Sequence, residues 1–484
     1  MNFKSVARIS GPLAAICILA AIDISGHPHA TAMLAVATWM AIWWISECVP
    51  LALTALIPLI FFPLLGITTG REVAPKYLNS IIFLFLGGFL IAQAMENTGL
   101  HKRIALNMLA RLHASPLQLA IGFSVATAFL SMWISNTATT MLMVTIALPL
   151  LHRLMEEHGR EQVAPMAASF LLIIAYSANI GGMGTPVGTA PNLVFLENIR
   201  AAAPELAPSF LEWMMIGLPM VAVGLIVLFL VLGPKLAQLP WESSNADQLQ
   251  NALLSLGSMR REERYVATVL TMTALLWMSR EGIVIEGFSI PGWSSLLPYP
   301  GVDDGTVAMF GATLLFLLKS GEGIPILNRE SFKRLPWEIV LLLGGGFALA
   351  SGMQQSGLSL WIGSQLGFLG GVPLVLMMLG IALAITFLTE VTSNTATTQV
   401  MLPILAATAL ANEMDLMMVL IPATLAASCA FMLPVATPPN AIVFGTDYVP
   451  MQAMVKVGIR LNLIMAFVIV TIVWLIRPIL PGII

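Results

Sequence analysis

The sequence predicts an all-α polytopic membrane protein built from two repeats of inverted topology. The first observation is composition: of 484 residues, 58% are hydrophobic and only 10% are charged, whereas about 25% are charged in soluble domains. The second is that apolar stretches long enough to span a bilayer, about 20 residues each, recur from Gly11 to Pro478. The third is an internal repeat. A soluble fold could not bury this much apolar surface, so we expect most of the chain to lie in a membrane.

Four motifs mark the repeat, and they occur in the same order in both copies. Three of them recur after 258 positions: LFLGGF at 84–89 with LLGGGF at 342–347, MENTGL at 95–100 with MQQSGL at 353–358, and SNTATT at both 135–140 and 393–398. The fourth, PVxTxPN, recurs after 248 positions, at 186–192 and 434–440. Four ordered matches exclude coincidence, and internal repeats of this kind are typical of transporter folds.

The repeat divides the chain into four parts. We expect a first transmembrane helix within 1–30, a first repeat at 31–235, a cytoplasmic connector at 236–264 and a second repeat at 265–484. Each repeat holds five spanning segments and one apolar stretch, at 117–154 and at 372–410, that the SNT motif interrupts at its middle. Because five is odd, the two repeats enter the membrane from opposite sides. This predicts eleven transmembrane helices and two re-entrant helical hairpins.

The distribution of basic residues predicts the orientation. With a cytoplasmic N-terminus, 17 of the 22 Lys and Arg residues fall inside, and five fall outside: Arg71, Lys76, Arg200, Arg280 and Arg477. The positive-inside rule therefore places the N-terminus in the cytoplasm and the C-terminus in the periplasm of a bacterial inner membrane. Residues 1–32 also have features of a secretory signal. We expect an uncleaved first span, because its removal would upset this charge distribution.

Several function classes find no support in the sequence. The net charge of −3 offers no basic surface for nucleic acid. The three cysteines show no metal-binding spacing, and the six histidines form no HExxH motif. A membrane-embedded enzyme would need a nucleophile, a metal or an acid pair at depth, so we expect no enzyme. A channel would need a continuous polar path, whereas hairpins that enter from opposite sides favour alternating access.

The two SNT motifs predict a binding site near the middle of the membrane. Ser, Asn and Thr side chains both donate and accept hydrogen bonds, and a hairpin turn leaves free carbonyl groups at one helix end and free N–H groups at the other. Oxygen atoms suit a hard cation, and N–H groups at a helix N-terminus suit a carboxylate. The alternative is that each motif is only a helix cap. The symmetric recurrence within apolar stretches favours a site.

Two further loops concentrate proline and small residues, at 184–192 (GTPVGTAPN) and 432–440 (MLPVATPPN). Proline disrupts a helix, so we expect these segments to be unwound, with a simple kink as the alternative.

The glycine runs at 87–88 and 344–346 indicate close helix packing. No Lys or Arg falls within the motifs, so a dianion bound there would need cations and helix dipoles to balance its charge. Glu390 lies near the second motif, and one interpretation is that it orients the hairpin.

These motifs resemble the divalent anion/sodium symporter family, which includes bacterial dicarboxylate carriers and mammalian dicarboxylate and citrate carriers. Residues 427–443 (ASCAFMLPVATPPNAIV) resemble its C-terminal signature throughout, and the two SNT motifs and the set Trp43, Trp44, Glu47, Pro50 and Thr54 extend the similarity over nearly the whole chain. The resemblance implies eleven spans, two re-entrant hairpins, a homodimer with a scaffold domain, and an elevator-type movement of a transport domain.

The resemblance also implies ligands for at least two Na+ sites and for a dicarboxylate. One Na+ would be held by Ser131, Ser135, Asn136 and Gly188, and the other by Thr389, Ser393, Asn394 and Ala436. Substrate carboxylates would contact Asn136, Thr137 and Thr189 on one side, and Asn394, Thr395, Thr437 and Pro438 on the other. Ala190 stands where the second repeat has proline, so the sequence does not determine the shape of the first loop.

The expected function is import of C4-dicarboxylates such as succinate, malate or fumarate by sodium symport. Two alternatives on the same fold stay open. One is a dicarboxylate exchanger that needs no sodium, and the other is a citrate or sulfate carrier, because the sequence does not fix the spacing between the two ends of the substrate.

Overall fold

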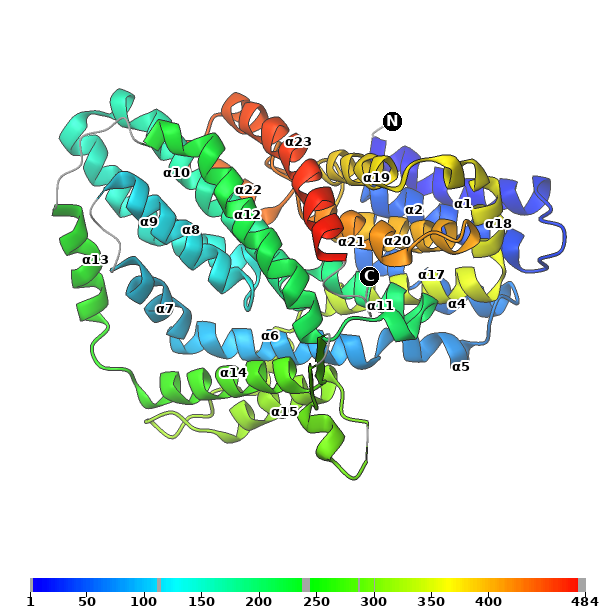
Figure 1. Ribbon diagram of the computed structural model, residues 1–484, viewed down its shortest axis with the longest axis horizontal. Helices are drawn as coiled ribbons and strands as arrows, with labels where there is room; N and C mark the ends of the chain where they lie inside the picture. The colour runs from blue at the N-terminus through cyan, green and yellow to red at the C-terminus, as the bar shows by residue number, and fades with distance from the viewer. Residues whose placement is uncertain (1–2, 111–114, 237–243, 286–287, 300, 478–484) are drawn as a thin grey trace.

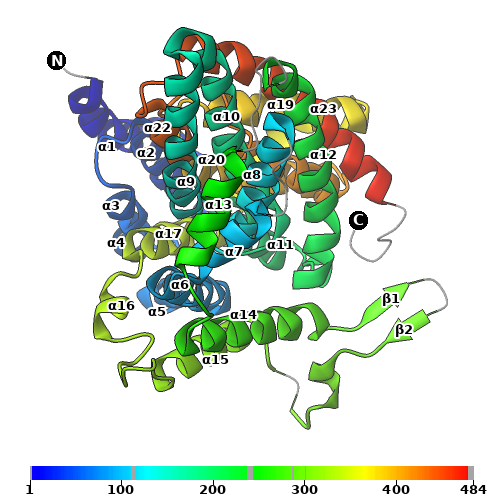
Figure 2. The same ribbon diagram turned by 90° about the vertical axis from the view of Figure 1, so that its left-hand side faces the viewer.

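The computed structural model describes residues 3–110, 115–236, 244–285, 288–299 and 301–477. Figures 1 and 2 show an almost entirely helical molecule in which α14 and α15 lie along one edge, beside α6. The first helix and the first repeat comprise α1 (Phe3–Ala21), α2 (Ala30–Ser46), α3 (Leu51–Ala55), α4 (Ile57–Leu64), α5 (Gly70–Val73), α6 (Ser80–Thr98), α7 (Leu100–Leu109), α8 (Pro116–Ser131), α9 (Asn136–His158), α10 (Arg160–Gly181), α11 (Ala190–Ala202) and α12 (Phe210–Leu236).

From α6 and α17 onward, the second repeat has the same order of helices as the first. It comprises α14 (Arg261–Ser279), α15 (Asp304–Leu317), α16 (Arg329–Lys333), α17 (Trp337–Gln355), α18 (Leu358–Gln365), α19 (Leu374–Thr389), α20 (Asn394–Ala411), α21 (Leu416–Ala427), α22 (Pro438–Phe444) and α23 (Met451–Ile476).

One turn shows how closely the repeats agree. Gly99 separates α6 from α7 with φ +76°, and Gly357, 258 positions later, separates α17 from α18 with φ +77°. This left-handed backbone conformation favours glycine. Both repeats therefore bend after the same helix for the same reason.

The glycine runs pack helices closely, as the sequence predicts. A Cβ atom on Gly87 would lie 2.5 Å from the carbonyl carbon of Ala308 in α15, and one on Gly345 would lie 2.5 Å from the carbonyl oxygen of Ala55 in α3. Contacts this short leave no room for a side chain. The two glycines are repeat mates, and each brings its helix against a neighbour at the backbone.

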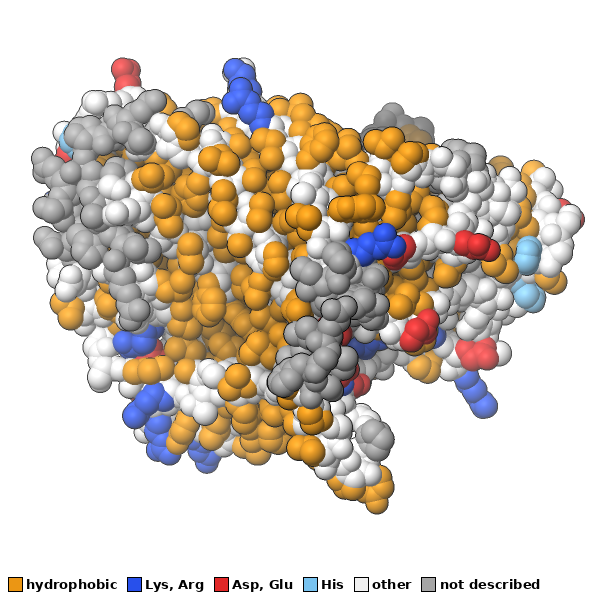
Figure 3. All heavy atoms as spheres, in the orientation of Figure 1, with side chains coloured by type: hydrophobic (Ala, Val, Ile, Leu, Met, Phe, Trp, Pro, Cys, Tyr) orange, Lys and Arg blue, Asp and Glu red, His pale blue; other side chains and the backbone are white. Residues whose placement is uncertain are grey.

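Seven of the described helices are long and apolar enough to cross a membrane: α1, α6, α9, α10, α12, α17 and α23. Shorter apolar helices include α2, α8, α15, α19 and α21. Figure 3 shows hydrophobic side chains over most of the middle of the face formed by α8, α10, α12 and α23, with most Lys and Arg atoms toward its upper and lower margins. A surface of this kind suits a lipid bilayer.

The structure differs from the all-α prediction in one small element. Strands β1 (Ile283–Ile285) and β2 (Phe288–Ile290) pair antiparallel between α14 and α15. β-branched residues dominate this short loop and favour extended backbone. The connector expected at 236–264 contains one helix, α13 (Ser244–Ser255).

Candidate functional site

The SNT motifs break two apolar helices at matching points. In the first repeat α8 ends at Ser131 and α9 begins at Asn136, and in the second α19 ends at Thr389 and α20 begins at Asn394. The Ser135 hydroxyl accepts a hydrogen bond from the N–H of Ala138 at 3.2 Å. The capping interpretation therefore holds for Ser135, whereas the matching Ser393 makes no such bond.

The proline-rich loops are unwound, as expected, and a buried asparagine braces each of them. The Asn192 side-chain N–H₂ group donates to the carbonyl oxygens of Gly182 at 3.0 Å and Thr185 at 2.8 Å. In the second repeat the Asn440 side chain donates to two carbonyl oxygens, each at 3.0 Å, those of Ala430 and Leu433. The donors and acceptors all correspond at a separation of 248, so the repeat extends to single hydrogen bonds.

Three oxygen atoms converge at the end of α8. Ser131 Oγ lies 2.5 Å from Asn136 Oδ1 and 2.8 Å from the carbonyl oxygen of Ala178. The Ser131 hydroxyl has a single hydrogen, and both neighbours are acceptors. One hydrogen cannot serve both at once, so this group, the first oxygen cluster, can also accept a cation. Carbonyl and hydroxyl oxygens at unwound helix ends are the ligands that transporters offer to Na+.

The second repeat contains the same arrangement, the second oxygen cluster. Thr389 Oγ1 lies 2.6 Å from Asn394 Oδ1 and 3.0 Å from the carbonyl oxygen of Ala427. Ser131 and Thr389 are both fully buried. The residues present therefore fit a cation in both repeats. The carbonyl groups of Ala178 and Ala427 were not among the expected ligands. Every residue has a backbone carbonyl group, so the sequence does not indicate which of them belong to a site.

A missing side chain opens space beside the first oxygen cluster. A Cβ atom on Gly182 would lie 2.9 Å from Asn136 Oδ1 and 3.2 Å from the carbonyl oxygen of Gly188. The structure thus brings Asn136 and Gly188 together, as expected. The matching residues in the second repeat, Ala430 and Ala436, have side chains, so the two sites differ in shape.

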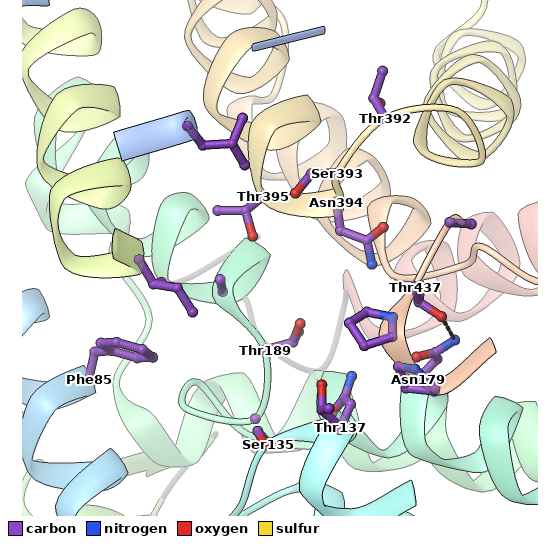
Figure 4. A pocket seen from close by; sticks show the side chains of 18 of the residues that line it. Phe85, Ser135, Thr137, Asn179, Thr189, Thr392, Ser393, Asn394, Thr395 and Thr437 are labelled. Atoms are coloured by element: carbon purple, nitrogen blue, oxygen red, sulfur yellow. Dashed lines mark hydrogen bonds between the residues drawn. The ribbon is translucent and has the colours of Figure 1, made fainter. Parts of the chain in front are cut away.

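Both motifs face one cavity of about 700 Å³. Figure 4 shows Ser135 and Thr137 on one side, Ser393, Asn394 and Thr395 on the other, and Thr189 and Thr437 between them. All seven residues expected to bind substrate line this cavity: Asn136, Thr137, Thr189, Asn394, Thr395, Thr437 and Pro438. Of the expected sodium ligands, Ser135, Gly188, Ser393 and Ala436 also line it. The structure therefore assembles most of the expected residues around one space.

Asn179 is a cavity residue that the sequence analysis missed. It lies in α10, and its side-chain N–H₂ group donates to Thr437 Oγ1 at 3.2 Å and to Asn440 Oδ1 at 3.5 Å (Figure 4). It joins the first repeat to the unwound segment of the second. Only a buried asparagine within an apolar helix could have indicated it.

The described lining of the cavity carries few charged side chains. Among the described residues, the ionisable side chains that line it are Lys4 and Glu47, both exposed. Asn136 and Asn394 of the oxygen clusters lie at the N-termini of α9 and α20. A bound dianion would therefore meet polar groups and helix dipoles in place of a fixed guanidinium.

Glu390 holds the second unwound segment. Its carboxylate accepts hydrogen bonds from the N–H groups of Phe431 at 2.7 Å, Met432 at 2.8 Å and Leu433 at 3.0 Å. It also accepts one from the Asn462 side chain at 2.7 Å. We expected Glu390 to orient the hairpin. Its hydrogen bonds instead hold the loop that follows α21.

Comparison with known proteins agrees with this architecture. A family model described as the sodium:sulfate symporter transmembrane region matches residues 4–480. The sodium-dependent dicarboxylate transporter SdcS of Staphylococcus saprophyticus is 40% identical over 469 residues, which cover 93% of this chain and 87% of that protein. SdcS of Staphylococcus aureus strain USA300 is 39% identical over 460 residues, which cover 93% and 86%.

Two solved structures share the fold at low sequence identity. The YdaH transporter of Alcanivorax borkumensis has a TM-score of 0.53 and 13% identity, over 87% of this chain and 88% of that one. MtrF of Neisseria gonorrhoeae has a TM-score of 0.56 and 11% identity, over 95% and 96%. The family match and the relatives at about 40% identity establish that this chain belongs to the divalent anion/sodium symporter family, whose members are membrane transporters and not enzymes.

Proposed function

We propose that this protein imports C4-dicarboxylates such as succinate, malate or fumarate by sodium symport. The observation that carries the proposal is the pair of oxygen clusters beside one cavity whose described lining includes no Arg and a single, exposed Lys, Lys4. The relatives with about 40% identity are named sodium-dependent dicarboxylate transporters, which supports both the cation and the class of substrate.

The two ends of the substrate would bind to the two broken helices. α9 begins at Asn136 and α20 at Asn394, so the N-termini of both helices face the cavity. Free N–H groups and the positive end of the helix dipole favour a carboxylate. One carboxylate would contact Asn136, Thr137 and Thr189, and the other Asn394, Thr395, Thr437 and Pro438.

Sodium would bind beside each carboxylate and share an asparagine with it. The first site would use Ser131, Asn136 and the carbonyl groups of Ala178 and Gly188. The second would use Thr389, Asn394 and the carbonyl group of Ala427, with Ser135, Ser393 and Ala436 close by. Because each asparagine would serve both the cation and the anion, binding of sodium would favour binding of substrate.

One asymmetry between the repeats supports alternating access. The α6 face formed by Phe85, Gly88, Phe89 and Ala92 lines the cavity. The matching α17 face, 258 positions later, is buried: Leu343, Gly346, Phe347 and Ala350. Gly346 packs against the Gln399 side chain of α20. In a protein of inverted repeats, exchanging these two environments would convert one access state into the other.

We infer an elevator-type movement, in which the broken helices and unwound segments move against α6 and α17. Lys4 lines the cavity and is exposed, and the orientation expected from the charges places Lys4 on the cytoplasmic side. The state would then be inward-open.

The eleven spans would be α1, α2, α3 with α4, α6, α10 with α11, α12, α14, α15, α17, α21 with α22, and α23. The helix pairs α8–α9 and α19–α20 would form the re-entrant hairpins. A homodimer in a bacterial inner membrane completes the proposal.

Uptake of labelled succinate into proteoliposomes tests the function. We expect accumulation only when a sodium gradient points inward. A sodium-independent exchanger would instead accumulate succinate when unlabelled dicarboxylate is preloaded, with or without sodium. Competition by malate, fumarate, citrate and sulfate separates the substrate classes, because a citrate or sulfate carrier would be inhibited most by its own substrate.

A further inference from the structure

A third group of buried oxygen atoms surrounds Glu390, at the junction of α19, α21 and α23. The Glu390 side chain is 3% exposed and forms no ion pair with a Lys or Arg in the described part of the chain. Its Oε1 atom accepts three hydrogen bonds, and its Oε2 atom accepts one, from Leu433. Since a carboxylate oxygen has two lone pairs, Oε2 can still accept another partner. A buried ionisable residue in a membrane segment suggests a functional site.

Asn462 in α23 adds a second oxygen to this group. Its side-chain nitrogen donates to Glu390 Oε1 at 2.7 Å, so its Oδ1 atom belongs to a carboxamide in contact with the carboxylate. The residue is fully buried, and no described residue donates a hydrogen bond to Oδ1. A buried acceptor of this kind costs stability unless something binds it.

Thr386 adds a third. It lies one helical turn before Glu390 on α19, and helical side chains lean toward the N-terminus of their helix, so the Glu390 carboxyl group extends over the turn that carries Thr386. Thr386 is fully buried, and its hydroxyl has no partner among the described residues. Helical threonines usually donate to the preceding turn, as Thr424 of α21 does to the carbonyl of Leu420 at 2.7 Å.

These three polar residues have apolar counterparts in the first repeat. The separation of 258 relates Glu390 to Met132 and Thr386 to Ala128. Gly217 of α12 packs against the carbonyl of Met183 as Gly458 of α23 packs against that of Phe431, which relates Asn462 to Val221. The polar group therefore occurs in one repeat only, unlike the paired oxygen clusters.

We propose that Glu390, Asn462 and Thr386 form a third Na+ site, so that three Na+ ions accompany each dicarboxylate. The inference rests on the proposed function, because it assumes sodium-coupled transport. The oxygen clusters occur as a pair and account for two ions, and a site present in one repeat makes the number odd. A carboxylate, a carboxamide oxygen and a hydroxyl are suitable ligands for a hard cation.

The charges of the bound species add a reason for a third ion. A dianion with two Na+ ions is neutral, so the buried charge of Glu390 would be left over in the loaded carrier. A third Na+ ion beside Glu390 makes the loaded carrier neutral, and the empty carrier then returns with one negative charge. An inside-negative potential would favour that return, so uptake would be driven by voltage through Glu390.

The experiment measures initial uptake of ²²Na+ and labelled succinate into proteoliposomes, with the potential set by valinomycin and K+. For the wild-type protein we expect a ratio of three Na+ per succinate and faster uptake at inside-negative potential. Thr386→Ala introduces the residue of the first repeat and leaves every donor to Glu390 in place. We expect it to raise the sodium concentration for half-maximal uptake by about tenfold, to lower the ratio to two, and to remove the effect of potential.

Two variants serve as controls. Thr386→Ser retains the hydroxyl, and Thr424→Ala removes a buried hydroxyl that bonds to its own helix, so both should keep a ratio of three.

A wild-type ratio of two without an effect of potential would overturn the third site while the proposed function stands. Transport that needs no sodium would overturn the proposed function itself. A Thr386→Ala protein that keeps a ratio of three and the effect of potential would overturn this assignment of the third site. A ratio of two Na+ and one H+ would assign the site to a proton and overturn it as a Na+ site.

Discussion

Arg103 of α7 holds Glu263 at the start of α14 with two hydrogen bonds, from Nε to Oε1 at 2.9 Å and from Nη2 to Oε2 at 3.1 Å. The same guanidinium group donates to the carbonyl of Gly257 at 2.9 Å. Glu263 is 2% exposed, so this is a buried, two-pronged ion pair. It fixes the beginning of the second repeat to the first.

We expect Arg103→Ala to destabilise the protein strongly. The change leaves the Glu263 carboxylate buried without its main partner, which costs about 3 kcal/mol. The control is Arg153→Ala, because the pair of Arg153 with Glu157 at 2.7 Å is partly exposed and contributes about 1 kcal/mol or less. The apparent melting temperature in detergent measures both, and equal losses in the two variants would contradict the assignment.

The same pair predicts a pH dependence of stability. Burial alone would raise the pKa of Glu263, but the hydrogen bonds and charges of Arg103 and Arg260 outweigh it and lower the pKa below the usual 4.5. A lowered pKa in the folded state means that the stabilisation is present above pH 4.5 and is lost as the pH falls through the folded value. We expect Glu263→Gln to melt at a temperature that changes less between pH 6 and about pH 3 than that of the wild type.

Asn136→Ala and Asn394→Ala are each expected to reduce succinate uptake by about 100-fold, the upper limit for the loss of a metal-site partner. Each asparagine belongs to an oxygen cluster and also lines the cavity, so its loss affects cation and anion together. The variants should still elute as folded protein in size-exclusion chromatography. Uptake at the wild-type rate by either one would remove that asparagine from the site.

Transport should discriminate between monovalent cations. We expect poor uptake with lithium and none with potassium, because the clusters include fixed backbone carbonyls that match one ionic radius. Initial rates are compared in sodium, lithium, potassium and choline at equal ionic strength. Equal rates in all four media would favour the exchanger.

The cavity-lining face of α6 and the buried face of α17 predict opposite labelling patterns. In a variant with Cys17, Cys48 and Cys429 replaced by serine, Phe89→Cys should react with an impermeant thiol reagent from the cytoplasmic side, because Phe89 is half-buried and lines the cavity. Phe347→Cys, at the buried repeat mate, should react from the periplasmic side once the carrier turns outward. If Phe347→Cys stays unreactive while transport proceeds, the exchange of environments between the two faces is wrong.

Much of the architecture could be predicted from the sequence, since repeated motifs such as SNT report residue types at fixed separations. The breaks before Asn136 and Asn394 and the unwinding after Gly181 and Ala427 were predictable, because proline and capping residues act locally. The carbonyl groups of Ala178 and Ala427 were not, because every residue has one and only the fold places them. Asn179 was missed for a related reason, since its partners lie in the other repeat.

The short strands β1 and β2 and the helix α13 show a different limit. Both lie outside the repeated motifs, so no second copy supported a prediction for either of them. Similarly, the partners of Glu390 come from segments about 40 and 72 positions away, so only the packing of α19, α21 and α23 reveals what it holds.

The cavity has its own approximate twofold symmetry, because one half comes from each repeat, with Asn136 and Asn394 as counterparts. A ligand with two identical ends, such as succinate or fumarate, makes the same contacts whichever end enters first. Malate has different ends and meets two inequivalent poses, which the difference between Gly182 and Ala430 would separate in energy. If one of those poses dominates, malate loses RT ln 2, about 0.4 kcal/mol, relative to a ligand that can bind in both directions. The departure of the cavity from perfect symmetry thus becomes a preference for symmetric ligands.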